Sequence, residues 1–158
     1  ASDVYKRQVV FLDPQQPTVR KMIKRVIGLP GDHLLISKHQ VIINGVAVPT
    51  QYHSQGFEYI PSAHNGSVRV QTEIHNQKID KHTLAIQRIP VLEEDFIISV
   101  EVPQGSYFVM GDNRENSKDS RYIGYVPERF LCGQAQYVVM SFGKPHGYYE
   151  WSRLGVLP

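Results

Sequence analysis

The sequence predicts a mainly β protein. Short runs of β-branched and aromatic residues, each closed by Gly, Pro, Asn or Asp, recur along the chain. Helical periodicity is weak throughout, with at best a single turn over Pro127–Leu131. Hydrophobic residues make up 41% and charged residues 20% of the 158 positions, which are the proportions of a folded domain with one substantial core.

The expected strands all show this pattern. In chain order they are Val9–Leu12, Met22–Ile27, Leu34–Ile36, Val41–Ile43, Val68–Gln71, Phe96–Val100, Tyr107–Met110 and Gln136–Met140. The stretch "LPGD" predicts a type II turn with Gly31 at positive φ. The stretch "SKHQ" predicts the connection of a hairpin, and Asn44–Gly45 predicts a second tight turn.

Composition divides the chain into three parts. Residues 9–36 and 99–158 carry the cleaner apolar strands and are expected to form the core. Residues 37–98 are expected to form an inserted hairpin and a peripheral β-rich lobe, because the stretch from about 49 to 95 holds four of the seven His and few apolar runs. Residues 1–8 have neither periodicity nor an apolar segment, and we expect a non-native or disordered leader there.

Composition also excludes several classes of function. The net charge of +2 is small and the Lys and Arg are scattered, so no nucleic-acid partner is expected. Cys132 is the single cysteine, which excludes an internal disulfide and a cysteine-based zinc site. The His residues lack the spacing of metal ligands, so we expect neither a metal nor a cofactor. No run approaches the roughly 18 to 20 apolar residues of a membrane span.

Lys24 stands out in the stretch "KMIKRVIG". Side chains alternate between the faces of a strand, so Lys24 shares its face with Met22 and Val26. One interpretation is an edge strand whose lysine extends to water. The other is a desolvated lysine, because burial lowers the pKa of an ammonium group and makes it a general base near neutral pH.

The stretch "GDNRENSKDSR" spans Gly111–Arg121 and is called the charged loop below. It follows the apolar run "SYFVM" and holds three acidic and three basic side chains: Asp112, Glu115 and Asp119 against Arg114, Lys118 and Arg121. Opposite charges in equal number indicate ion pairs that fix a loop, and the alternative is an ordinary solvated charged loop.

Three segments together resemble the bacterial type I signal peptidases: "MIKRVIGLPGD", "VPQGSYFVMGDNRENSKDSRYIGYVP" and "GQAQYVVMSF", in this order. That family removes signal peptides from exported proteins with a Ser-Lys dyad. The resemblance covers Val9 to about Ile36 and Glu101 to the end of the chain. It implies a signal-peptidase-like core, a β-barrel or coiled sheet, with a peripheral β-rich insertion.

The resemblance also implies roles for single residues. Lys24 would be the general base, and the Ser117 hydroxyl would hydrogen-bond its amine and orient it. Charged side chains would hold the charged loop against the site: Asp119 with Arg121, and Asp112 with Arg114, with Arg25 on the other face of the Lys24 strand as a candidate partner.

One part of the family pattern is not found. The family's nucleophile lies in a Ser-Met-x-Pro-Thr-like segment well before the lysine, and Ser2 is the only serine before Ser37. We therefore expect the N-terminal part of the catalytic domain, with the nucleophile and the membrane anchor, to be missing from this chain. The chain alone is then expected to be inactive.

The resemblance further implies where the whole protein acts. Its partners would be signal-peptide-bearing preproteins and the membrane lipid surface. It would reside in the bacterial inner membrane with its catalytic domain on the periplasmic or outer face. Two alternatives stay open, namely a non-catalytic relative that only binds peptides, and a Ser-Lys self-cleaving regulatory domain.

Overall fold

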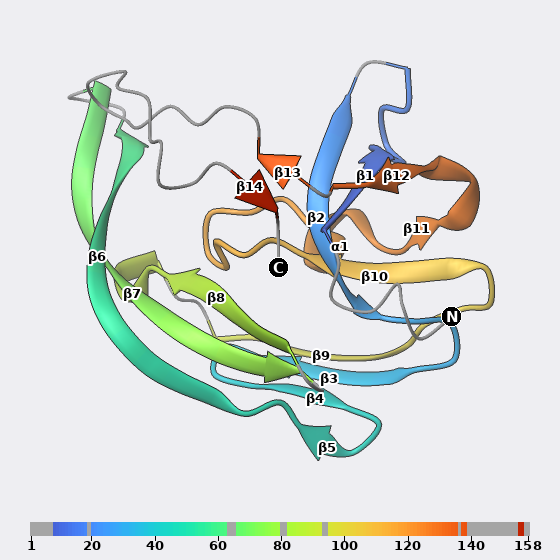
Figure 1. Ribbon diagram of the computed structural model, residues 1–158, viewed down its shortest axis with the longest axis horizontal. Helices are drawn as coiled ribbons and strands as arrows, with labels where there is room; N and C mark the ends of the chain where they lie inside the picture. Colours follow the sequence, from blue (N-terminus) through green and yellow to red (C-terminus); the bar gives the residue numbers. More distant parts are fainter. Residues whose placement is uncertain are drawn as a thin grey trace.

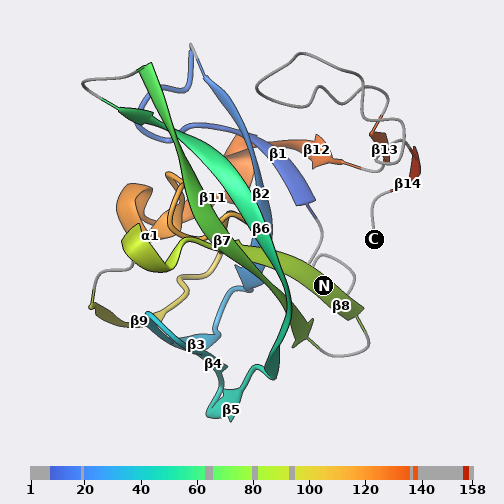
Figure 2. The ribbon, with the colours of Figure 1, turned by 90° about the vertical axis from the view of Figure 1, so that its left-hand side faces the viewer.

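The computed structural model describes residues 8–18, 20–62, 66–79, 82–92, 95–135, 137–138 and 155–156. The fold is mainly β, as predicted, and the strand pairs are antiparallel apart from one isolated bridge. Figures 1 and 2 show the sheets at different orientations, with the long curved β6–β7 hairpin on one side of the molecule. Short helical segments lie between the strands at Pro90–Leu92 (η1), Ser120–Ile123 (α1) and Glu128–Phe130 (η2).

A five-stranded sheet holds the parts of the sequence that resemble the peptidases. Its order is β11-β10-β2-β1-β12, made by Val126–Pro127, Ser106–Met110, Lys21–Gly28, Gln8–Leu12 and Leu131–Gln134 respectively. Strand β2 lies in the middle because its apolar residues pack on both faces of the sheet. The predicted helical turn after β11 is present as η2.

The second sheet has the order β5-β4-β3-β9, made by Val46–Ala47, Val41–Ile43, His33–Ser37 and Ile97–Glu101. All three predicted turns around it are present. Asp32 N donates to Leu29 O over 3.0 Å, and Gly31 has φ +88°, as a type II turn requires. Asn44 and Gly45 have φ values of 51° and 79°, which connect β4 to β5.

The third sheet, β6-β7-β8, is built from Thr50–Ser62, Gly66–Ile79 and His82–Arg88, and is called the β6–β8 lobe below. The sequence predicted only Val68–Gln71 of it. No residue of β6 is buried, and β7 is buried only at Thr72, Gln77 and Ile79, so polar residues interrupt the apolar ones and no long apolar run marks these strands. Of the last predicted strand, Gln136–Met140, the structure describes Tyr137–Val138 (β13), which pairs with Gly155–Val156 (β14); its remaining residues lie outside the described ones.

Two hydrophobic clusters lie on opposite faces of the five-stranded sheet. One contains Val9, Phe11, Met22, Val26 and Val109 among others. The larger one joins core residues to residues of the expected insertion: Ile27, Ile36, Phe108 and Met110 pack with Val41, Val48, Ile79 and Leu84. The β6–β8 lobe and the hairpin before it therefore share their buried surface with the core.

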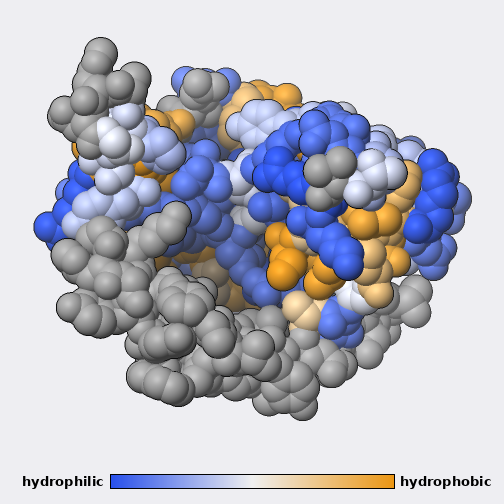
Figure 3. All heavy atoms as spheres, turned by 90° about the horizontal axis from the view of Figure 1, so that it is seen from above, coloured by the Kyte–Doolittle hydropathy of each residue, from blue (hydrophilic) through white to orange (hydrophobic). Residues whose placement is uncertain are grey.

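Strand β1 begins at Gln8, whereas the sequence predicted a non-native or disordered leader up to this residue. Gln8 pairs with Arg25 of β2, and its side chain bonds the charged loop. The rest of that leader lies outside the described residues. Within the described part of the chain, no helix has the length and apolar composition needed to cross a bilayer. Seen from above, the surface is mostly hydrophilic, with separate groups of apolar side chains (Figure 3).

Candidate active site

Lys24 lies on the central strand β2 with apolar residues around it. Its neighbours on the same face, Met22 and Val26, are 6% and 0% exposed, and Val9 lies opposite it on β1. These residues belong to one hydrophobic cluster, whereas Lys24 itself is only partly exposed. The sequence-based expectation of a lysine between two apolar neighbours on a buried face is therefore confirmed.

Strand β10 brings the charged loop next to Lys24. The last pair between β10 and β2 is Met110 with Arg25, so the charged loop begins where this pairing ends, next to Lys24 in the sequence of β2. Asp112, Asp119 and Arg121 of the loop lie near enough to act on the charge of Lys24. A Cβ built on Gly111 would lie 2.0 Å from Ser117 Oγ, so Ser117 occupies the space that a side chain at Gly111 would fill.

The predicted hydrogen bond between Lys24 and Ser117 is nevertheless not formed. Ser117 Oγ is buried and has no hydrogen-bond partner in the described part of the chain. The physical reason is local: the hydroxyl is turned onto the backbone of Gly111, while the Lys24 amine lies at the end of a long, partly exposed side chain. The structure thus places Ser117 over Gly111, at the end of the β2–β10 pairing, without a hydrogen bond to Lys24.

The electrostatic surroundings of Lys24 favour its neutral form. Burial lowers the pKa of Lys24 below its ordinary value. Asp119 acts against this, Arg20 and Arg121 lower the pKa further, and Asp112 raises it. The net shift is downward, and no described carboxylate forms an ion pair with the Lys24 amine.

Asp119 and Arg121 form the ion pair that the sequence predicted. Arg121 Nε donates to Asp119 Oδ1 over 2.9 Å and Arg121 Nη2 donates to Asp119 Oδ2 over 2.8 Å, and Asp119 is fully buried. Asp119 also caps α1 and accepts from Gly111 N over 2.8 Å, which ties the end of the charged loop to its start. Burial alone would lower the pKa of Arg121, but the hydrogen bond and charge of Asp119 raise it above its ordinary value.

Asp112 pairs with Arg25, the candidate partner from the opposite face of β2. Arg25 Nε and Nη2 donate to its two carboxylate oxygens, each over 2.8 Å, and the Arg25 side chain is 5% exposed. Gln8 Nε2 donates to the same carboxylate over 2.9 Å. Sequence reasoning missed Gln8 because nothing local connects it with a loop more than a hundred residues away.

The expected pairing of Asp112 with Arg114 is wrong. Arg114 is buried, and its Nη2 donates to Gln77 Oε1 of β7, while its backbone oxygen accepts from Arg121. Burial, and next to it the charge of Arg121, lower the pKa of Arg114 to about 10. The two arginines bond different parts of the fold. Arg25 bonds Asp112 from β2, whereas the side chain of Arg114 bonds Gln77 of the β6–β8 lobe.

Lys118 and Asp13 are further residues at the site that sequence reasoning missed. Asp13 is fully buried just after β1, and Lys118 Nζ lies 3.7 Å from its Oδ2 and 2.9 Å from Gln15 Oε1. The only signal in the sequence for this contact was that an acidic residue, Asp13, directly follows an apolar strand. The described residues contain no group of three or more His, Cys, Asp or Glu that could hold a metal ion.

A desolvated lysine beside a loop of buried ion pairs, in a mainly β protein, is the arrangement expected of a peptidase with a lysine base. The family model described as "Signal peptidase, peptidase S26" matches residues 1–140. The chain therefore belongs to the S26 family of signal peptidases.

Individual relatives agree with this family. A signal peptidase I of Pseudomonas aeruginosa is 33% identical over 162 residues, which cover 94% of this chain and 54% of the relative. One of Haemophilus influenzae is 32% identical, covering 82% of this chain and 40% of the relative. A solved signal peptidase I structure from Enterococcus faecalis aligns with a TM-score of 0.49 and 24% identity, over 83% of this chain and 94% of that one. The chain spans about half the length of the first of these relatives.

Proposed function

We propose that this chain carries the general-base half of a Ser-Lys endopeptidase that cleaves signal peptides from exported proteins. The observation that carries the proposal is Lys24, an amine with a lowered pKa, packed among apolar residues next to the charged loop. A neutral amine can take the proton of a serine hydroxyl, as in the Ser-Lys variants of serine hydrolases. The nucleophilic serine would belong to a part of the protein outside these 158 residues.

In the proposed mechanism the neutral Lys24 amine removes the proton from that serine as its oxygen attacks the scissile carbonyl. The resulting ammonium then gives the proton to the leaving amine, so that the lysine returns to its neutral form. Desolvation lowers the pKa of Lys24, which favours the first step. The role proposed for Ser117 is to restrict the Lys24 amine once the serine is in place, since apo sites are often looser than complexes.

We propose that the substrate binds as an added strand along β2. Pairing between β2 and β10 ends at Arg25 and Met110, because the chain turns away at Gly111. The β10-facing side of Lys21–Lys24 therefore has no neighbouring strand among the described residues, although β1 pairs with the other side. An extended peptide on that side would gain main-chain hydrogen bonds and run beside the Lys24 amine. Signal-peptide-bearing preproteins and a membrane surface are the partners proposed for the whole protein.

The test is cleavage of a signal-peptide substrate by the complete protein with Lys24→Ala. We expect loss of cleavage with an unchanged fold, because an amine is removed and no buried charge is left without its partner. Lys78→Ala is the matched control, since Lys78 is an exposed lysine on another strand, β7. Near-normal cleavage by the Lys24→Ala variant would refute the proposed role of this residue.

A further inference from the structure

The charged loop has little backbone pairing of its own. Between β10 and α1, its one described ladder contact is an isolated parallel bridge of Asn113 with Gln87, the penultimate residue of β8. Gln87 N donates to Asp112 O over 2.8 Å, and Arg114 N donates to Gln87 O over 2.9 Å. The end of the β6–β8 lobe thus serves as a short extra strand for the charged loop.

Glu58, in the middle of β6, adds a side-chain tie at the same place. One carboxylate oxygen accepts from Asn113 Nδ2 over 2.5 Å and from Gln87 Nε2 over 3.0 Å. The other oxygen accepts from Asn116 Nδ2 over 3.1 Å. Hydrogen bonds to an ionised carboxylate are stronger than those between neutral groups. A single side chain of β6 therefore connects β8 with two positions of the charged loop.

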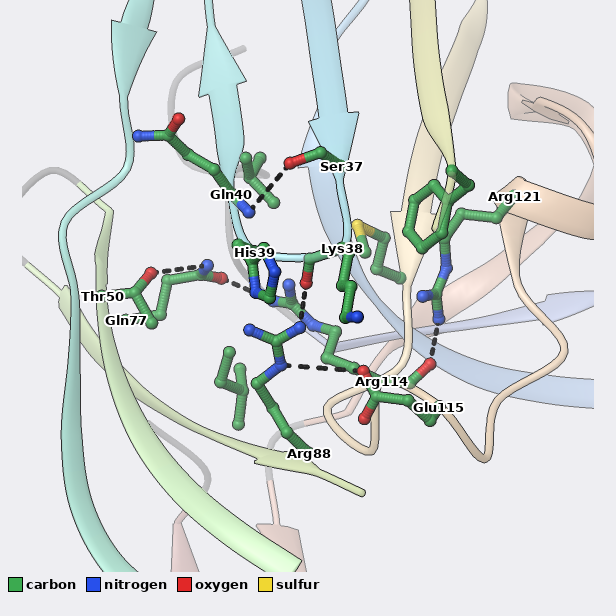
Figure 4. A pocket seen from close by; sticks show the side chains of 14 residues that line it. Ser37, Lys38, His39, Gln40, Thr50, Gln77, Arg88, Arg114, Glu115 and Arg121 are labelled. Carbon is green, nitrogen blue, oxygen red and sulfur yellow. Dashed lines mark hydrogen bonds and ion pairs between the residues drawn. The ribbon is translucent and has the colours of Figure 1, made fainter. Parts of the chain in front are cut away.

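Two more ties come from β7 and β8, and Figure 4 shows them around a small cavity of about 20 Å³. Gln77 points toward Arg114 and accepts from its guanidinium, while its amide nitrogen donates to Thr50 over 3.2 Å. Glu115 accepts from Ile89 N over 2.7 Å, and its other oxygen lies 3.7 Å from Arg88 Nε. The loop from Asp112 to Asn116 is thereby bonded to every strand of the lobe.

Ser117 is placed by its neighbours on both sides. It follows Asn116, which Glu58 holds, and precedes Lys118, which bonds the loop after β1. Its own hydroxyl has no partner among the described residues and therefore contributes nothing to fixing its position. Whatever holds Asn116 also sets where the Ser117 hydroxyl lies above Gly111.

We infer that the β6–β8 lobe is the positioning element of the charged loop and that Glu58 is a positioning residue for Ser117, acting through Asn113 and Asn116. This inference rests on the proposed function, because the place of Ser117 affects turnover only if Lys24 is the base. Displacing a supporting group by about 1 Å can lower a rate by up to about 100-fold. A lobe that lies outside the reacting atoms can control turnover in this way.

The experiment compares Glu58→Gln with the wild type in the complete peptidase. The glutamine side chain has the size of glutamate. Its NH₂ group, however, would face N–H donors at a position where the carboxylate has an accepting oxygen. We expect kcat to fall on the order of tenfold with KM nearly unchanged. The acidic limb of the kcat/KM profile should move to higher pH, because a loosened loop admits water and weakens the desolvation that lowers the pKa of Lys24.

Glu73→Gln is the matched control. Glu73 lies on β7 in the same lobe and bonds His75, and among the described residues it forms no hydrogen bond or ion pair with the charged loop. A second variant tests the hydrogen bond from Asn116 to Glu58. Asn116→Asp replaces the donor with a second carboxylate that repels Glu58, so it should lower kcat as well. Combining it with Glu58→Gln restores a donor and an acceptor, and kcat should recover about threefold or more over the single variants.

Amide exchange gives a readout that needs no catalysis. Glu58→Gln should speed exchange at the Gln87 and Arg114 amides, which form the bridge, and leave the Asn44 and Val48 amides, bonded to His33 and Val41 in the second sheet, unchanged. Unchanged exchange, or a lower melting temperature with unchanged kcat and pH profile, would overturn the positioning role. If Lys24→Ala stayed active, the proposed function would fail, whereas faster exchange in Glu58→Gln would still establish the tie between lobe and loop.

Discussion

Ser117 lies directly over the Cα of Gly111. A Cβ built on Gly111 would lie 2.0 Å from Ser117 Oγ and 2.6 Å from Ser117 Cβ, which is far inside van der Waals contact. The nearest atoms belong to a short side chain that is held from both sides, so it cannot easily move away. Glycine is needed here for close approach and not for an unusual backbone angle, since its φ is not among the positive values.

Gly111→Ala should therefore destabilise the fold by about 1–3 kcal/mol, as overpacking of a well-packed site does. Chemical denaturation of the chain measures this directly. Gly133→Ala is the control, because no heavy atom lies within 4 Å of a Cβ there and its φ is not positive. The control should be neutral or stabilising by up to about 1 kcal/mol.

A second substitution separates overpacking from other effects of Gly111→Ala. Adding Ser117→Gly removes both atoms that the new methyl group meets, so the double variant should regain part of the lost stability. Equal stability of the single and double variants would contradict the contact between the two residues.

Lys24→Met should make the chain more stable at neutral pH, with a gain that shrinks as the pH rises toward 10.5, the ordinary pKa of lysine. The pKa of Lys24 is lower in the folded state, so between that lowered value and 10.5 the unfolded state binds more protons. The free energy of unfolding of the wild type therefore increases with pH in this window. Unfolding curves of both proteins from pH 7 to 10.5 measure the difference, and a constant difference would show that Lys24 is not desolvated.

Asp119→Asn should be among the most damaging single changes. It leaves the Arg121 guanidinium without its counter-charge in a buried site and weakens the bond from Gly111 N. Breaking a buried pair in this way costs about 3–5 kcal/mol. Asp95→Asn is the matched control, since Asp95 is 94% exposed and its pair with Lys38 at 3.4 Å contributes about 1 kcal/mol at most. Similar melting temperatures for the two variants would mean that the charged loop is solvated.

Asp112→Asn should likewise weaken the two-pronged ion pair with the buried Arg25, at a cost of about 3 kcal/mol. Replacing both partners, with Arg25→Met and Asp112→Asn, should be less harmful than Asp112→Asn alone, because no buried charge then remains. A double-mutant cycle measured by thermal unfolding gives the coupling. Additive losses would indicate that the two side chains contribute independently.

The sequence by itself determined the fold class and most of the core strands, and it indicated a candidate site. Short β-branched runs between turn residues specify strands locally, and the predicted turns at Gly31 and Asn44–Gly45 depend on positive φ values that few residues tolerate. The alternation around Lys24 is also local, so its buried face could be predicted from Met22 and Val26 alone. Asp119 and Arg121 are only two positions apart, so their ion pair could likewise be predicted from the sequence.

Only the tertiary structure decided which distant groups meet. Arg25 rather than Arg114 pairs with Asp112, because the register of β2 against β10 sets them side by side across 87 positions of sequence. The β6–β8 lobe was predicted as peripheral because its polar strands have no apolar pattern, yet Glu58 and Gln77 bond the charged loop. The place of the Ser117 hydroxyl, over Gly111 and without a bond to Lys24, likewise depends on packing. Such contacts arise from long-range pairing and shared burial, and no local preference encodes them.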